Sequence, residues 1–180
     1  MTIYIVGSGG SLNGFDFDRL KGYDVMAINH MFRFVPFCRH LVAIDNVFYE
    51  QFESDLAGLA CTKHALYKYS DTPLHEKLGV KEWKWRKNDG LDTDPYVAHN
   101  WNSGLTGINI ALNLGYRDIH LLGFDADSST LPGINKSKHD YMIARCNMIA
   151  RQLPDGVRIT NHSMRSRITA FNKIDINIAL

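Results

Sequence analysis

Two segments of the sequence combine glycines with small polar residues in patterns that could bind a phosphate or a nucleotide. The first is the run Gly7-Ser8-Gly9-Gly10-Ser11, which directly follows the apolar run Thr2–Val6. Glycine lets the backbone approach a ligand closely, and the N–H groups of such a turn can face an anion. The run is not a Walker loop, since no Gly-Lys-Ser/Thr follows, and Leu12 replaces the third glycine of a dinucleotide fingerprint. An ordinary strand-to-helix turn is an equally good interpretation.

The second segment, from Asn102 to Asp125, reads as a capped helix, a glycine turn and a buried strand that leads to an acid. Asn102 or Ser103 can cap a helix over residues 103–114, and Gly115 suits the position after its end. Ligands of open α/β sheets bind outside the carboxyl ends of the strands. We therefore expect Ser103, Gly104 and Asp125 to face the same crevice as the glycine run. A side chain at Gly9 should then occupy the space of the ligand and leave the fold intact.

Polar residues also follow two other predicted strands. Asn29 comes after the apolar run 24–28, and Asp45 and Asn46 come after the run 41–44. The amide of Asn29 offers both a donor and an acceptor, which suits a base or a ribose edge better than a phosphate. The alternative, of equal weight, is a strand-end residue that bonds its own backbone.

A candidate general base stands further along the chain. His139 follows the Ser-, Gly- and Pro-rich loop 126–137 and begins a predicted helix over residues 138–153. From there it could reach a cleft if the loop closed over it. A solvated histidine at a helix start explains the same pattern. Asp125 and Asp127 form a short acid pair that could hold hydrated Mg²⁺ beside a diphosphate, although such pairs are common by chance.

Two groups of basic residues could contact an anion or an acceptor. Arg165 and Arg167 could clamp a phosphate, and a solvated charged face explains them equally well. The run 83–87 alternates Trp with Lys and Arg, as nucleic-acid surfaces often do. An edge strand with protective charges is the simpler account of that run.

The elements that must position these residues follow an α/β pattern. Short apolar runs at residues 2–6, 24–28, 41–44 and 119–122 each lead into a polar turn, as in a parallel sheet. We also expect strands at 63–69 and 157–160, helices at 48–59 and 163–174, and an edge hairpin or an excursion over the site at 77–93. The sequence thus predicts one Rossmann-like domain over residues 1–180, with a mostly parallel central sheet flanked by helices.

The composition is that of an ordinary soluble protein. Of its 180 residues, 45% are hydrophobic and 22% charged, and the formal net charge of +1 gives no reason to expect nucleic acid or an anionic membrane as the main partner. No stretch reaches the roughly 18 apolar residues of a membrane span. Three cysteines without a CxxC pair suggest neither a zinc site nor a disulfide framework. We expect a cytoplasmic protein without a membrane span and leave its oligomeric state open, a homo-oligomer included.

Taken together, the motifs resemble a known family. The turn Gly7–Leu12, Asn29 after the second strand and the segment Gly104–Asp125 are similar to the bacterial sialyltransferases of glycosyltransferase family 42. Asn161-His162-Ser163 is similar to a polar motif near that family's C-terminus. The same signatures occur in a wider sialyltransferase-like group, which includes archaeal-type 6-hydroxymethylpterin diphosphokinases.

The resemblance implies a site for a cytidine nucleotide. It assigns the glycine run to the phosphate and ribose, Asn29 to the nucleotide, and Asn102 with Ser103 to the nucleotide or donor sugar. It places Asp45 or Asn46 near the leaving phosphate, Ser163 at the nucleotide, and His139 in the position of the base.

Three functions agree with these observations. The first is a glycosyltransferase-like enzyme that uses a nucleotide-activated sugar, CMP-linked by the resemblance, on an unknown acceptor. The second is a diphosphotransferase of the pterin kinase type, which needs Mg²⁺. The third is a nucleotide-binding protein without turnover.

Overall fold

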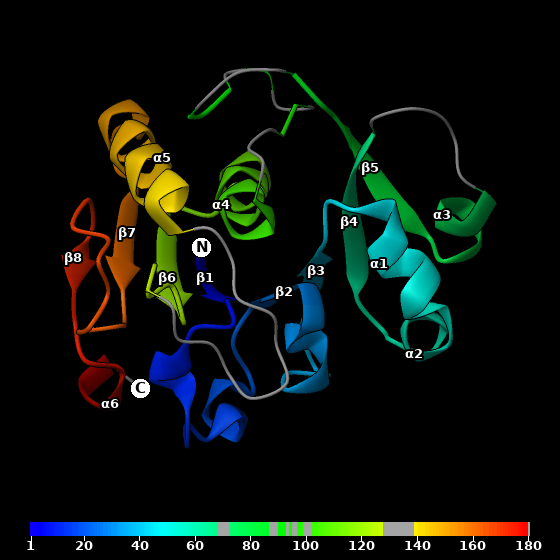
Figure 1. The fold of residues 1–180 in the computed structure, drawn as a ribbon, viewed down its shortest axis with the longest axis horizontal. Coiled ribbons are helices and arrows are strands. Elements are labelled where there is room, and N and C mark those ends of the chain that lie inside the picture. Colours follow the sequence, from blue (N-terminus) through cyan, green and yellow to red (C-terminus); the bar gives the residue numbers. More distant parts are fainter. Residues whose placement is uncertain are drawn as a thin grey trace.

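A single parallel sheet organises the chain. The computed structural model describes residues 1–67, 73–86, 90–92, 94, 97–98, 102–127 and 139–179. Its eight strands pair in the order β5-β4-β3-β2-β1-β6-β7-β8, and every pairing is parallel (Figure 1). The strands are β1 (Thr2–Val6), β2 (Val25–Ile28), β3 (His40–Val42), β4 (Thr62–Tyr67), β5 (Val80–Lys84), β6 (Asp118–Leu122), β7 (Arg158–Asn161) and β8 (Asn172–Lys173). The predicted α/β class with a parallel sheet is confirmed.

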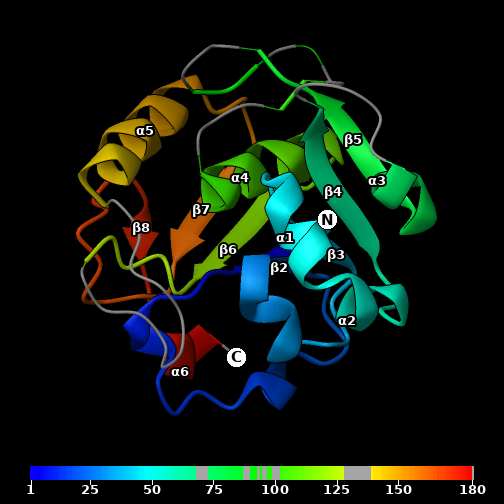
Figure 2. The same cartoon turned by 45° about the vertical axis from the view of Figure 1, so that its right-hand side comes forward.

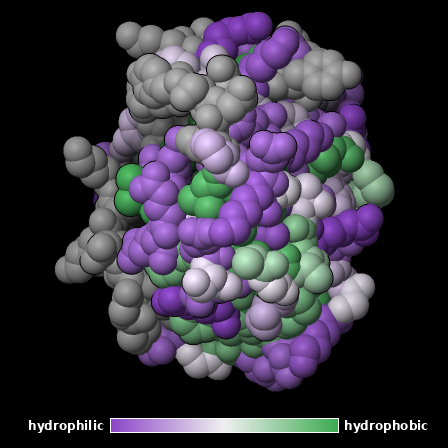
Figure 3. Space-filling view, turned by 90° about the vertical axis from the view of Figure 1, so that its right-hand side faces the viewer, coloured by the Kyte–Doolittle hydropathy of each residue, from purple (hydrophilic) through white to green (hydrophobic). Residues whose placement is uncertain are grey.

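Helices cover both faces of this sheet (Figures 1 and 2). One face carries α4 (Ser103–Asn113) and α5 (His139–Gln152). The other face carries shorter elements: the 3₁₀ helices η1 (Gly10–Leu12), η2 (Phe17–Leu20) and η3 (Asn29–Arg33), and the helices α1 (Asn46–Gln51), α2 (Glu53–Ala57), α3 (Pro73–Lys77) and α6 (Ile176–Ala179). Figure 3 views the side with α1, α2 and α3, where hydrophilic side chains predominate and apolar ones show in scattered patches. No helix in the described ranges combines the length and the apolar character needed to cross a bilayer.

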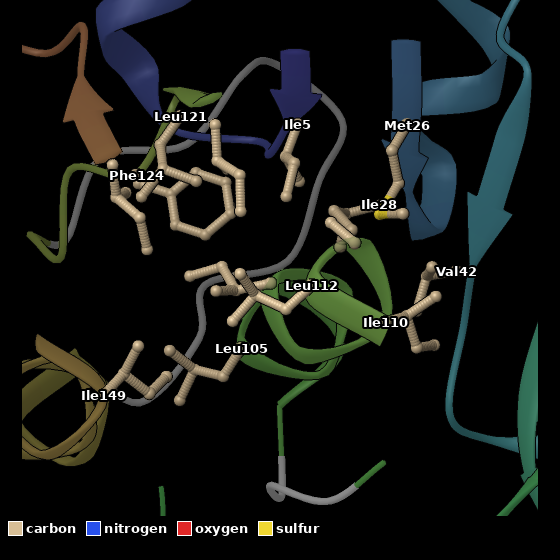
Figure 4. Packing of buried hydrophobic residues seen from close by; sticks show 14 of the residues in the cluster. Ile5, Met26, Ile28, Val42, Leu105, Ile110, Leu112, Leu121, Phe124 and Ile149 are labelled. Atoms are coloured by element: carbon tan, nitrogen blue, oxygen red, sulfur yellow. The ribbon is translucent and has the colours of Figure 1, made fainter. Parts of the chain in front are cut away.

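The alternation of side chains along each strand feeds two separate cores. In β1, Ile3 and Ile5 pack under α4 and α5, whereas Tyr4 and Val6 pack under the shorter elements. Figure 4 shows sheet residues such as Ile5 pointing toward α4. Helix α4 is buried on almost every side, from Ser103 to Leu112. The position of this helix is therefore tightly constrained, and with it the position of its N-terminus.

Three sequence-based assignments differ from the structure. The stretch 163–174 is not a helix but a turn leading into β8, because the Ser166 hydroxyl accepts from the Ile168 N–H and the strand pairs with β7. The predicted helix 48–59 is split into α1 and α2 at Phe52, whose φ of −114° and ψ of 20° are not helical. Within the stretch 77–93, β5 is a parallel edge strand rather than a hairpin; its Trp83 is buried while Lys81 and Lys84 are exposed, as expected for a charged edge.

A network of hydrogen bonds below α4 links residues of β5, β4 and β3 to Tyr116 and to Asp24, the residue before β2. Trp83 Nε1 lies 3.0 Å from His64 Nδ1, His64 Nε2 lies 3.1 Å from His40 Nδ1, and His40 Nε2 lies 3.3 Å from the Tyr116 hydroxyl. That hydroxyl donates to the Asp24 carboxylate over 2.8 Å. Since the indole can only donate and the carboxylate can only accept, both imidazoles must be neutral with their proton on Nε2. Burial lowers the pKa of His40 to about 4 and that of His64 to about 3.

The two neutral histidines of this hydrogen-bond network predict that the protein loses stability in mild acid. In the unfolded chain both histidines titrate near pH 6.5, above their pKa in the folded protein, so protons favour the unfolded state as the pH falls below that value. The free energy of unfolding should be unaffected by these groups above pH 6.5. It should fall by about 1.4 kcal/mol per pH unit for each histidine as the pH drops from 6.5 toward 4. Urea denaturation across this range measures the effect, and imidazole nitrogen NMR assigns it. A charged His40 or His64 ring in the folded protein at pH 6 would contradict the assignment.

Candidate functional site

One pocket lies at the point in the sheet where the order of the strands changes direction. From β1 the chain proceeds through β2 to β5 on one side of the sheet, and from β6 it proceeds through β7 to β8 on the other. The carboxyl ends of β1 and β6 therefore form the switch point at which open α/β sheets bind ligands. A pocket of about 90 Å³ opens there, lined by Gly7, Ser8, Gly9, Ile28, Asn29, Asn102, Ser103, Gly104, Gly123, Phe124, Asp125, Ala126 and Met142. Residues that the sequence predicts to share one crevice thus come together here, from the segments that follow β1, β2 and β6 and from the start of α4.

Hydrogen bonds continue the pairing of β1 and β6 into the loops that follow them. Gly7 N–H donates to the Leu122 carbonyl over 2.8 Å, and Gly9 N–H donates to the Gly123 carbonyl over 2.9 Å. Beyond them, Ser11 donates twice to the Asp125 carboxylate, from N–H to Oδ2 over 2.7 Å and from Oγ to Oδ1 over 2.6 Å. Asp125 is only 2% exposed, so these bonds supply the compensation that a buried carboxylate requires. The glycine run and the loop after β6 therefore form one braced unit.

The role expected for Gly9 has to be corrected. A Cβ built on Gly9 would lie 2.5 Å from the Gly123 carbonyl oxygen and 2.6 Å from Asp125 Cγ. A side chain there would strike the protein itself rather than an open ligand space. Gly9 is needed first because the two loops pack closely, and a substitution will not leave the fold undisturbed.

We therefore expect Gly9→Ala to destabilise the protein by about 1–3 kcal/mol, the usual cost of forcing an extra carbon into a packed region. Gly58→Ala is a matched control, because Gly58 has φ −89° and a Cβ there would meet nothing within 4 Å. The control should change the free energy of unfolding by less than about 0.5 kcal/mol. Chemical denaturation of both variants measures the difference. Equal stability of the two variants would show that the loops are not packed as described.

Two residues of the pocket adopt a left-handed backbone without being glycine. Asn29 has a φ of 50° and Ala126 a φ of 52°. Asparagine tolerates this conformation, whereas alanine adopts it at a cost. Strained residues of this kind persist where the surroundings fix them, and they cluster at functional sites. Asn29 directly follows β2, Ala126 lies in the loop after β6, and both line the pocket.

The N-terminus of α4 forms another wall of the pocket. Asn102 is its cap, because Oδ1 accepts from the N–H groups of Gly104 and Leu105 over 2.9 and 3.2 Å. The Ser103 hydroxyl accepts from Ile44 N–H at 3.4 Å, which links α4 to the end of β3. A helix N-terminus favours negative charge, so this wall suits a phosphate or carboxylate. The cap uses Oδ1 of Asn102, a residue that also lines the pocket, and the ligand contact that the resemblance implies stays a prediction.

The remaining predicted site residues lie elsewhere or are only partly described. Gly10, Ser11 and Ser163 line a neighbouring cavity of about 360 Å³ behind the glycine run, and Ser163 is 1% exposed. Asp45 is exposed at the start of α1, and Asn46 lines a third cavity, between α1 and α3. His139 is the first residue of α5, and its side chain lies outside the described part of the chain, as does most of the loop 126–137.

The carboxylates considered for Mg²⁺ are engaged by protein groups. Asp125 is held by Ser11, and Asp127 accepts from Arg165, with Nη2 at 2.8 Å. Within the described residues, no three His, Cys, Asp or Glu side chains come together as a metal site. Arg167 pairs with Asp140 over 2.9 Å. Both arginines therefore form surface ion pairs, in agreement with the solvated-face interpretation.

Sequence reasoning missed the brace that holds the loop after β6 from its far side. Asn161 Nδ2 donates to the Phe124 carbonyl over 3.1 Å, and the Ser166 hydroxyl donates to the same carbonyl over 2.6 Å. Arg167 N–H donates to the Asp125 carbonyl over 2.8 Å. The motif Asn161-His162-Ser163 drew attention to this region, but its first residue proves to support the pocket loop rather than to line the pocket.

Comparison with known proteins places the fold. No model of a protein family and no curated protein sequence matches the chain. Among solved structures, it is similar to a MAf glycosyltransferase from Magnetospirillum magneticum AMB-1, with a TM-score of 0.68 and 15% sequence identity. The similarity covers 97% of this chain and 33% of that protein, so the chain spans about a third of its length. At this identity the likeness shows the fold, an α/β architecture of the Rossmann type.

Proposed function

We propose that the chain is glycosyltransferase-like and binds a nucleotide-activated sugar, CMP-linked, in the pocket at the β1/β6 switch point. The observation that carries the proposal is the meeting of the glycine run, the amide of Asn29 and the N-terminus of α4 around one pocket. The sequence resemblance to sialyltransferases and the fold shared with a MAf glycosyltransferase support it. The pocket is smaller than the roughly 300–1,000 Å³ of most ligand sites. It can hold the part of the donor nearest the sheet, with the rest outside.

The pocket suggests how a donor would lie. The dipole of α4, whose N-terminus lines the pocket, favours the negative charge of the phosphate at that wall. Asn29 offers an amide to the base or ribose, and Ser103, the first residue of α4, lines the same pocket. Direct displacement at the anomeric carbon would release the nucleotide phosphate, whose developing charge these groups stabilise.

The two left-handed residues give a matched test of donor binding. Asn29→Gly keeps the backbone conformation and removes the amide, so affinity for CMP should fall by about five- to tenfold, the worth of one or two hydrogen bonds. Ala126→Gly relieves strain at the same kind of position and removes only a methyl group. It should leave affinity nearly unchanged and protein stability equal or higher. Calorimetric titration with CMP and CMP-sialic acid measures both variants against the wild type. Equal affinity of Asn29→Gly and the wild type would remove Asn29 from the site.

The proposed general base is His139, which begins α5 directly after the loop 126–137. His139→Ala should lower the rate of CMP release from a CMP-sugar by about a hundredfold, the usual loss for a general base, with donor affinity nearly constant. Normal turnover in this variant would assign the base to another residue.

Metal dependence separates this proposal from a diphosphotransferase. A diphosphotransferase should bind a nucleoside triphosphate only with Mg²⁺, whereas the proposed site should bind CMP equally well with EDTA. Binding without release of nucleotide from any CMP-sugar would identify a nucleotide-binding protein without turnover.

A further inference from the structure

A second pair of histidines lies on the face of the sheet opposite α4. His120 projects from β6 beside Tyr4 of β1, and His162 directly follows β7. His120 Nδ1 lies 2.7 Å from His162 Nε2, and the two ring planes meet at 16°. His162 is 6% exposed and the His120 side chain 15%. Because water has little access, the ring nitrogens depend on protein groups for their hydrogen bonds.

The outer nitrogen of each ring faces an acceptor. His120 Nε2 lies 3.3 Å from Asp118 Oδ2, and His162 Nδ1 lies 3.0 Å from the carbonyl oxygen of Ile174. Neither a carboxylate nor a carbonyl can donate, so these two bonds and the bond between the rings need three protons. Two neutral imidazoles carry only two. The complete set of bonds therefore requires one proton more than two neutral rings hold.

This proton count separates the pair from the network of His40 and His64. That network runs from a donor, the Trp83 indole, to an acceptor, the Asp24 carboxylate, and two neutral rings complete it. The bonds through His120 and His162 run from one acceptor to another. Neutral rings thus suit the first network, whereas the second is complete only when it has taken up a proton.

The surroundings of the pair favour one added proton and oppose a second. The bond from Arg158, with a smaller contribution from His120, lowers the pKa of Asp118, so an anion faces the pair. Tyr4 stacks on His120 with centroids 4.7 Å apart, and an aromatic face attracts a cation. Burial and then the charge of His120 lower the pKa of His162, which opposes a second proton. Around the pair the structure places these charged or titratable groups: Asp118, Arg158, Tyr4, Tyr23 and Asp175.

Loss of the added proton must leave one acceptor facing another. The ionised Asp118 forms the stronger, charge-assisted bond, so His120 Nε2 keeps its proton. His162 Nδ1 then releases its proton to solvent, and the proton between the rings moves from His120 Nδ1 to His162 Nε2. This leaves a bare nitrogen opposite the Ile174 carbonyl. The contact that is lost is the one to the segment after β8.

That segment connects β8 to α6 and begins at Ile174, whose N–H also donates to the Asn161 carbonyl over 3.2 Å (Figure 1). Residues 175–177 and His162 line the cavity of about 360 Å³ behind the glycine run. We propose that His120 and His162 form a proton-operated clamp, which holds the segment after β8 against the end of β7 when the pair has taken up one proton. The clamp closes as the pH falls through the range in which histidine titrates, near pH 6.5. This inference does not depend on the proposed function.

Imidazole nitrogen NMR on the whole chain tests the shared proton. At about pH 5.5, three of the four ring nitrogens of the pair should carry protons, and at about pH 8.5 only two, with His162 Nδ1 bare. Both rings should follow one transition, because the proton belongs to the pair. Four protonated nitrogens at the lower pH, an unchanged number of protons, or two separate transitions would overturn the proposal.

Two substitutions should move this transition in opposite directions. Asp118→Asn removes the anion and supplies an amide that can donate to His120 Nε2, so the added proton should leave at a pH lower by about one unit. Arg158→Gln removes the cation that faces Asp118 and should move the transition to higher pH. Arg39→Gln is the matched control, because it removes a similarly exposed arginine paired with another aspartate, and it should leave the transition in place. Shifts in the same direction, or none, would contradict the assignment.

Hydrogen exchange tests the clamp itself. Protection factors, which correct for the intrinsic pH dependence of exchange, should fall about fivefold at the Ile174 and Asn177 amides as the pair loses its proton. The amides of β1 should keep their protection over the same pH range. Equal protection of Ile174 and Asn177 on both sides of the transition would show that the proton leaves without opening the segment, and it would remove the clamp.

Discussion

The double hydrogen bond between Ser11 and Asp125 is the interaction on which the pocket depends. It joins the glycine run after β1 to the loop after β6, across the switch point of the sheet. A carboxylate that is 2% exposed is stable there only because both its oxygens are bonded. Both oxygens of Asp125 are thus bonded to Ser11, and the carboxylate holds the two loops of the pocket together.

A second set of bonds fixes the same loop from the C-terminal part of the chain. Asn161 and Ser166 both donate to the Phe124 carbonyl, and α4 is held in place by burial along nearly its whole length. Because these supports surround the pocket, two residues can keep a left-handed backbone at its rim. The walls of the pocket are therefore held by contacts within the protein.

The sequence predicts the parts of this fold that carry a regular pattern. Strands β1, β2, β3 and β6 are short apolar runs that end in polar turns, and α4 has both an asparagine cap and a glycine after its end. β8 and the turn before it were missed because their conformation comes from Asn161, Ser166 and pairing with β7, none of which leaves a periodic pattern. β5 was assigned poorly because an exposed edge strand has polar residues on most positions.

The location of the pocket could be predicted from the sequence, but the hydrogen bonds that each side chain makes there could not. Strand ends and a helix start identified the pocket, since topology alone brings them to one edge. Which oxygen bonds which donor depends on tertiary contacts, so the bonds between Asp125 and Ser11, 114 residues apart in the chain, could not be read from the sequence. The pairing of His75 with Glu82 is likewise invisible in the sequence, because α3 and β5 meet only in the fold.

Backbone amide NMR during a titration with CMP tests the central claim most directly. The account predicts saturable shifts confined to the amides around the switch point, at Gly7–Gly9, Asn29 and the start of α4, with little change at the β5 edge. Saturable shifts centred away from these residues, or none at all while the protein stays folded, would contradict a nucleotide site at the β1/β6 crevice.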